Sequence, residues 1–188
     1  MTDERRVPED DRLADNVGQR FDRLPATPAD RTVSGRASRE EVIEWWVEQY
    51  GVDPAIFEGY SFWEKGAGKV WICAEKETSQ ALPSPIEIEA LGMTFMRTRQ
   101  RHWKPTTAAV QRFGHHAKKN VLVLEGAEAA AFARGEDIPY ESWDGDWGYL
   151  VVAHELAGDV EPIGVGLYLY DELRSTVPKG RQESLADL

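Results

Sequence analysis

The chain has 188 residues, of which 41% are hydrophobic, so it can build the core of one ordinary domain with a tail or a small satellite. Its net charge is −11, with seven Lys beside fifteen Arg, a balance that indicates a surface adapted to high salt. The single cysteine, Cys73, excludes an internal disulfide framework and a cysteine-rich metal site. The hydrophilic start, and the lack of any apolar run near the roughly 20 residues that span a bilayer, predict a cytoplasmic protein with no membrane segment.

Residues 1–37 predict a flexible arm. They mix seven Arg with eight acidic residues and three Pro, and their apolar residues have no regular spacing. A segment of this kind buries too little apolar surface to offset the entropy that it loses on ordering. The alternative is an arm that docks on the domain through Phe21 and Leu24.

The pattern changes at Ser38, where the folded domain is expected to begin. The run from Ser38 to Glu41 is a capping box, in which a Ser and a Glu three residues later satisfy free N–H groups of a helix start. Apolar residues follow at helical spacing as far as Tyr50, and Gly51 supplies the stop. The sequence therefore predicts a helix over residues 39–50.

A helical turn and a hairpin follow this helix. Asp53 before a proline predicts a short turn that ends near residue 59. Residues 60–64 and 69–74 are apolar and rich in β-formers, and a glycine-rich turn separates them. They predict the two strands of a hairpin, with Cys73 as an inert core residue.

The rest of the domain is predicted to consist of short elements. Prolines at 83 and 85 break the chain, and a polar aromatic loop occupies residues 140–147. The expected elements are strands at 93–101, 120–124, 149–154 and 163–170, and short helices through 109–113 and 127–134. Many short strands with a few short helices indicate an α+β fold built on a small mixed β-barrel.

One segment, residues 90–124, reverses the charge of the chain. It holds seven Lys or Arg and three His with no Asp or Glu, whereas the remaining 15 basic residues share the chain with all 33 acidic ones. A long carboxylate-free segment in an acidic protein favours an anion-binding surface, and nucleic acid is the commonest large anion in a cell. The alternative is a basic strip that pairs with the acidic faces of the chain itself.

Three arginines in this segment are predicted to form a ladder. Arg97, Arg99 and Arg101 share one parity, so in a strand they would project from one face about 6.6 Å apart. His102 and Trp103 follow directly and are candidates for stacking on bases. The alternatives are a salt-bridged edge strand and a buried tryptophan.

The order of several motifs resembles the PUA-like RNA-binding domain at the C-terminus of RsmF-type (NOL1/NOP2/Fmu) rRNA cytosine methyltransferases. The likeness extends over residues 38–181. Its motifs are Leu91-Gly92-Met93 before a basic strand, Lys104-Pro105 after it, Phe132-Ala-Arg-Gly135 at a helix end, Gly164 in a late strand, and Pro178-Lys-Gly-Arg181.

This resemblance implies a PUA-like barrel and a non-catalytic protein that binds structured rRNA or tRNA, in ribosome biogenesis or rRNA modification. Ser175-Thr-Val177 departs from the residues usual before the last motif. The methyl-donor glycine motif is absent, and the family mechanism needs two cysteines where this chain has one. We therefore expect an RNA-binding domain without its enzyme, whose partners are RNA and either a separate methyltransferase or the ribosomal subunit.

The expected domain runs from 38 to 181 and is followed by a tail, 182–188. We expect Lys179 and Arg181 to lie beside the arginine ladder and to bind the same phosphates. We expect no DNA partner, cofactor or metal ion. The candidate RNA-binding residues are Arg97, Arg99, Arg101, His102, Trp103, Lys104, Arg112, Lys118, Lys119, Lys179, Gly180 and Arg181.

Two other motifs of the chain are candidate sites. Adjacent His115 and His116 diverge on a helix or a strand and do not readily chelate one ion, so an enzyme that uses them is the third hypothesis. Asp144 begins a calcium-loop-like run without the required glycine, so a turn is expected there. The second hypothesis is a protein-interaction module of a ribosome-assembly complex, in which Trp45, Trp46 and the aromatic loop face a protein partner.

Overall fold

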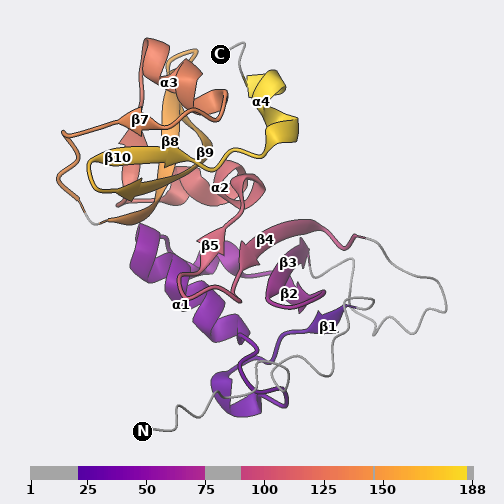
Figure 1. Cartoon of the computed structure of the whole chain (residues 1–188). Coiled ribbons are helices and arrows are strands. Elements are labelled where there is room, and N and C mark those ends of the chain that lie inside the picture. Colours follow the sequence, from indigo (N-terminus) through magenta and orange to yellow (C-terminus); the bar gives the residue numbers. More distant parts are fainter. Residues whose placement is uncertain (1–20, 75–89, 146, 186–188) are drawn as a thin grey trace, which may run out of the picture.

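The computed structural model describes residues 21–74, 90–145 and 147–185. These residues form two five-stranded sheets with a few short helices, so the α+β class is confirmed (Figure 1). The strand orders are β1-β2-β3-β4-β5 and β6-β8-β9-β10-β7. Over the described residues neither sheet returns to its own first strand, so the expected barrel takes the form of two open sheets.

The first sheet is entirely antiparallel and contains the predicted hairpin. Both hairpin strands have the expected bounds, and Gly68 in the turn has φ +64°. A Cβ atom on Gly68 would lie 2.5 Å from the backbone nitrogen of Arg99, so only glycine fits this close approach. The strands are β1 (Asp22–Arg23), β2 (Tyr60–Glu64), β3 (Lys69–Ala74), β4 (Met93–Arg97) and β5 (Lys104–Pro105).

Strand β4 contains a bulge and ends at Arg97, earlier than the expected strand 93–101. Val70 of β3 pairs with Met96, but the next residue of β3 pairs with Thr94, so Phe95 is an extra residue. Phe95 and Met96 are consequently both fully buried, and the alternation restarts with Arg97 exposed. The chain then turns back and pairs β5 with β4, so the parity argument for a three-arginine ladder was wrong.

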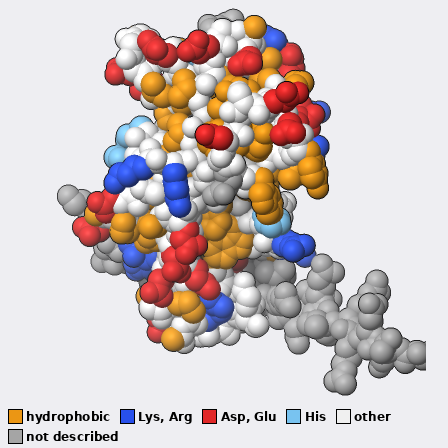
Figure 2. Space-filling view, turned by 90° about the vertical axis from the view of Figure 1, so that its left-hand side faces the viewer, with side chains coloured by type: hydrophobic (Ala, Val, Ile, Leu, Met, Phe, Trp, Pro, Cys, Tyr) orange, Lys and Arg blue, Asp and Glu red, His pale blue; other side chains and the backbone are white. Residues whose placement is uncertain are grey.

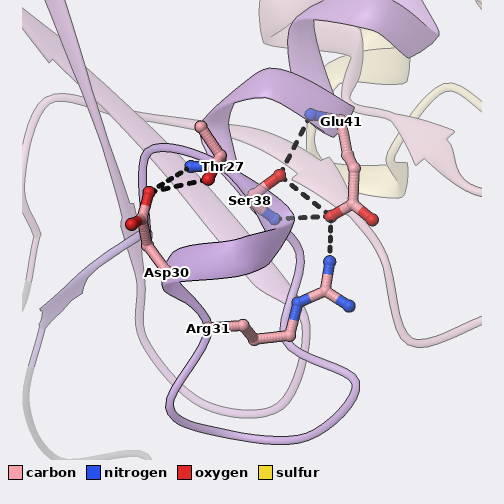
Figure 3. A network of polar contacts seen from close by, with 5 residues as sticks. All are labelled: Thr27, Asp30, Arg31, Ser38 and Glu41. Carbon is pink, nitrogen blue, oxygen red and sulfur yellow. Dashed lines mark hydrogen bonds and ion pairs between the residues drawn. The ribbon is translucent and has the colours of Figure 1, made fainter.

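The helix α1 (Arg39–Tyr50) forms as predicted. The Ser38 hydroxyl accepts from the N–H of Glu41 at 3.2 Å, and the Ser38 N–H donates to the Glu41 carboxylate at 2.8 Å (Figure 3). Arg31 donates to the same carboxylate. Gly51 ends the helix in the left-handed conformation. The predicted turn is η2 (Pro54–Phe57), capped by Asp53.

Residues 21–37, which we expected within a flexible arm, are part of the fold. They form β1 and η1 (Pro28–Asp30), and Leu24 is buried. Arg36 bonds to Glu64 at 2.6 Å and to Asp22 at 3.1 Å, with all three side chains largely shielded from solvent. Tertiary ion pairs and single buried residues therefore order a segment that has no periodic pattern. The first 20 residues of the expected arm lie outside the described residues, as does the predicted break at 82–85.

The second sheet combines one parallel and three antiparallel pairings. Strands β8 and β9 make a long hairpin, and β6 pairs with β8 in parallel. The sequence predicted β6, β8 and β9 but not the two short strands that complete the sheet. Its strands are β6 (Val121–Val123), β7 (Ile138–Pro139), β8 (Gly148–Leu156), β9 (Asp159–Leu169) and β10 (Glu172–Ser175).

Four further helices follow α1 and η2 among the residues that the structure describes. Helix α2 contacts both β4 and β9 and so lies between the two sheets (Figure 1). Thr106 caps its start, because the Thr106 hydroxyl accepts from the Ala109 N–H at 3.1 Å. Part of the expected tail belongs to the last helix. These helices are α2 (Thr107–Phe113), η4 (Gly114–His116), α3 (Gly126–Ala133) and α4 (Lys179–Leu185).

The buried residues of the described ranges form two hydrophobic clusters. In the larger one, Trp46 stacks on Phe95 with ring centroids 5.0 Å apart, and this pair joins α1 to β4. The smaller one fills the space between α3 and the second sheet around Phe132. Cys73 is buried, as expected. Within the described ranges no helix is both long and apolar enough to cross a bilayer.

Candidate nucleic-acid interface

A groove of about 510 Å³ brings together three basic side chains from distant parts of the chain. Arg97 comes from the end of β4, Lys104 from the start of β5, and Arg181 from α4. Threonine and glutamine side chains complete much of the lining, and among the described residues no acidic side chain lines it. We call this the basic groove.

Local structure explains how each cation reaches the basic groove. Arg97 and Lys104 are direct partners in the β4–β5 ladder. Arg181 is held by its Nη1 atom, which donates to Oε1 of Gln111 on α2 at 2.8 Å. The expected approach of the C-terminal motif to the early basic strand is therefore present for Arg181 and Arg97. Lys179 and Gly180 are exposed beside it but do not line the groove.

Lys104 is the most shielded of the three cations. Burial, together with the nearby guanidinium of Arg97, lowers the pKa of Lys104 below its usual value. Its Nζ atom also lies 5.8 Å from the ring centroid of Tyr149. A partly desolvated ammonium ion next to a second cation favours an anionic ligand, because such a ligand relieves the repulsion between them.

The neighbouring hollow is a cleft of about 830 Å³ between α1, the β4–β5 loop and the ends of β8 and β9. Its walls carry four aromatic residues and His102, and three glutamates of α1 line one side. We call it the aromatic cleft. Its lining includes Glu41, Glu44, Trp45, Glu48, Gln49, Arg101, His102, Trp103, Trp147, Gly148, Tyr149, Leu167 and Leu169.

The face that carries the aromatic cleft is shown in Figure 2. Hydrophobic side chains lie at the middle of this face, with acidic side chains directly to their left and histidine and basic side chains to their right; further basic and histidine side chains lie above the acidic ones. Trp147 is 63% exposed, and its ring meets that of His102 edge-on at 5.5 Å between centroids. The cleft therefore presents open aromatic surface between a negative and a positive border.

Two hydrogen bonds fix the width of the aromatic cleft. The side-chain amide of Gln49 donates to the carbonyl of Tyr149 at 2.9 Å. The side-chain amide of Asn120 in turn donates to the carbonyl of Gln49 at 2.7 Å. These bonds attach the C-terminal half of α1 to the second sheet, so the walls of the cleft are held by rigid elements.

The loop of residues 98–103 separates the two hollows. The predicted RNA-binding residues of this segment therefore do not all face the same hollow. Arg101, His102 and Trp103 line the aromatic cleft, whereas Arg99 lines neither hollow. The expected ladder is thus replaced by Arg97 on one side of the loop and Arg101 on the other.

The remaining predicted residues lie away from both hollows. Arg112, on α2, is exposed, as are Lys118 and Lys119, and none of the three lines a hollow. The backbone N–H groups of Lys118 and Lys119 donate to the carbonyl of Tyr50 and so cap the end of α1. The backbone of these two lysines thus helps to end α1, whatever their side chains bind.

The histidine candidates show no metal centre. His115 and His116 are exposed, with ring centroids 3.9 Å apart. Burial, and then the neighbouring His115, lowers the pKa of His116. His154 is tied by Nδ1 to the carbonyl of Leu124 at 2.8 Å. Over the ranges that the structure describes, no three His, Cys, Asp or Glu side chains gather as metal ligands would.

Sequence reasoning missed the acidic wall and the role of Tyr149. Glu41, Glu44 and Glu48 recur at spacings of three and four, which places them on one helix face beside Trp45. That pattern was visible, but nothing local indicated that this face meets the basic segment.

The fold and these hollows define a class: an α+β protein of two sheets, in which a basic groove and an aromatic cleft share one loop. Residues 7–92 match a family model described as a family of unknown function (DUF7122). No curated protein matches the chain. The matched range contains the α1 wall of the aromatic cleft and ends before β4, so the described residues that line the basic groove all follow it.

Proposed function

We propose that the protein binds RNA through the basic groove, without catalysis. The observation that carries this proposal is the convergence of Arg97, Lys104 and Arg181 on one hollow whose described lining has no carboxylate. The net charge of the chain is −11, so a cluster of three cations without a carboxylate differs from the mostly acidic composition of the chain. Phosphate groups are the ligands that arginine and lysine clusters bind best in water.

The lining of the groove favours a polynucleotide over an isolated phosphate. Thr94, Gln100 and Thr176 offer hydrogen bonds next to the cations, which suits ribose hydroxyls and phosphate oxygens. The aromatic cleft lies directly across the loop, and exposed aromatic rings beside a basic track are the usual surface for unpaired nucleotides. The resemblance to a PUA-like RNA-binding domain agrees with this function, and rRNA and tRNA are the substrates that it implies.

The test removes two of the three cations. In the Arg97→Gln/Arg181→Gln variant, we expect weaker binding to a labelled tRNA or rRNA fragment. The slope of log affinity against log salt should fall by about 0.7 to 0.9 per lost phosphate contact. Fluorescence anisotropy at several salt concentrations measures both, and circular dichroism checks the fold.

Arg134→Gln/Arg174→Gln is the matched control. Both arginines are exposed, both pair with a nearby glutamate, and neither lines a hollow. Its RNA affinity and salt slope should equal those of the wild type. A folded groove variant with unchanged affinity and slope would refute RNA binding at this site and favour a protein partner.

A further inference from the structure

We infer that the aromatic cleft receives one unstacked base of the bound RNA and that it selects guanine. This inference rests on the proposed function, because the RNA backbone in the basic groove brings the base to the cleft. The charge of the cleft decides what enters it. Of the three glutamates that line it, Glu41 is paired with Arg31, so Glu44 and Glu48 stand against one arginine of the lining, Arg101. A phosphodiester would be repelled there, whereas an uncharged base with N–H donors is attracted.

The two hollows are adjacent, which is the first condition for such a pocket. Gln100 lines the basic groove, and the next residue, Arg101, lines the aromatic cleft. Lys104 lines the groove, and its ammonium group also faces the ring of Tyr149 in the cleft at 5.8 Å. A strand held by its phosphates at the groove can therefore turn a base over the loop and into the cleft.

The shape and surface of the cleft suit a base. Its volume of about 830 Å³ lies within the range of small-molecule sites and exceeds the needs of one base. Trp103, Trp147 and Tyr149 supply ring surfaces, and Trp147 is exposed for 63% of its area. Unpaired RNA bases stack on such rings when proteins recognise them.

The glutamates supply the selectivity. Glu41 is occupied by Ser38 and Arg31. Glu44 and Glu48 are exposed and lie one helical turn apart, and within the described part of the chain neither makes a hydrogen bond or an ion pair. They are therefore available to a ligand.

A carboxylate only accepts hydrogen bonds, so it selects a base edge with two adjacent donors. Guanine presents N1–H beside its amino group and can bond both oxygens of one carboxylate. Adenine and cytosine present an acceptor nitrogen beside the amino group, and uracil presents one N–H between two carbonyls. The Watson–Crick edge of guanine is thus the only one that matches Glu44 or Glu48 without placing an acceptor against the carboxylate.

The experiment compares nine-residue oligoribonucleotides of uridine whose central residue is G, A, C or U. We expect the G oligonucleotide to bind the wild type at least about fivefold more tightly than the others, as one bidentate pair implies. Glu44→Gln/Glu48→Gln should lose this preference without weakening the binding of the all-U oligonucleotide. Trp147→Ala should weaken the G oligonucleotide and leave the salt slope unchanged.

Glu155→Gln/Glu161→Gln is the matched control. These two glutamates are exposed on the β8–β9 hairpin, and neither lines the cleft. This variant should keep the preference for G. The groove variant Arg97→Gln/Arg181→Gln should weaken all four oligonucleotides equally and also keep the preference.

The outcomes separate this inference from the proposed function. Salt-dependent binding with no base preference, and no effect of Trp147→Ala, overturns the guanine pocket and leaves RNA binding intact. If none of the four oligonucleotides binds, and neither tRNA nor rRNA fragments bind, both the guanine pocket and the proposed RNA binding are overturned. Binding of an arginine-rich peptide that is lost in Glu44→Gln/Glu48→Gln, without any base preference, overturns the guanine pocket in favour of a basic protein partner.

Discussion

Replacing Arg36 by methionine should destabilise the protein strongly. The Arg36 side chain is 9% exposed, and its Nε atom lies 2.6 Å from the carboxylate of Glu64, which is 3% exposed. Methionine keeps most of the buried stem but removes the charge, so Glu64 loses its guanidinium in a site shielded from water. Breaking a buried ion pair from one side typically costs about 3 to 5 kcal/mol.

A loss of this size is easily measured. For a chain of this length it corresponds to a fall in Tm of roughly 6 to 20 °C. Thermal and urea unfolding, followed by circular dichroism, would report it. The control is Arg134→Met, which breaks an exposed pair with Glu136 and should leave Tm unchanged.

A double variant tests the cause of the loss. Adding Glu64→Gln to Arg36→Met removes the buried negative charge, while the amide oxygen can still accept from the Gly68 N–H, now 2.9 Å from the carboxylate. Part of the lost stability should return. A single variant that loses less than about 1 kcal/mol would refute the reasoning, as would a double variant less stable than the single one.

Two further predictions concern α1. Burial raises the pKa of Tyr50, and its hydroxyl has no hydrogen-bond partner among the described residues. Tyr50→Phe should therefore leave the urea midpoint unchanged or raise the free energy of unfolding, by at most about 3 kcal/mol. A clear loss of stability would show that the hydroxyl has a partner. Burial alone would raise the pKa of Glu41, but hydrogen bonds from Ser38 and Arg31 outweigh it and lower the pKa. The ionised Glu41 carboxylate therefore stabilises the fold above about pH 4.5, and this contribution is lost as the pH falls further. The difference in unfolding free energy between wild type and Glu41→Gln should shrink at pH 3.5. A difference that stays constant with pH would contradict this.

The sequence predicted elements wherever local chemistry determines them. The capping box at Ser38, the stop at Gly51 and the glycine turn of the β2–β3 hairpin each act within a few residues, and all three appear in the structure. The α+β class follows from such elements. Their arrangement into two open sheets does not, because it depends on which strands pair over long separations.

The errors have a common physical origin in tertiary contacts. Residues 21–37 lack any periodic pattern, yet the ion pairs of Arg36 reach Asp22 and Glu64, which are 14 and 28 residues away. The extra residue Phe95 resets the alternation of β4 and is visible only in the pairing with β3. For the candidate site, charge indicated the basic groove, but it did not indicate that the glutamates of α1 meet the same loop.

The bond between Gln49 and Tyr149 joins residues that are 100 positions apart. Closing a chain segment of this length costs more entropy than closing a hairpin such as β2–β3, because the cost grows with the number of residues in the loop. The aromatic cleft thus exists only when α1 is docked on the second sheet. A partly folded chain can display Arg97 and Lys104 on their hairpin, but it cannot yet hold them beside Arg181 or beside a finished cleft. The ability to hold a ligand at both hollows therefore belongs to the completed fold, and it distinguishes native molecules from folding intermediates.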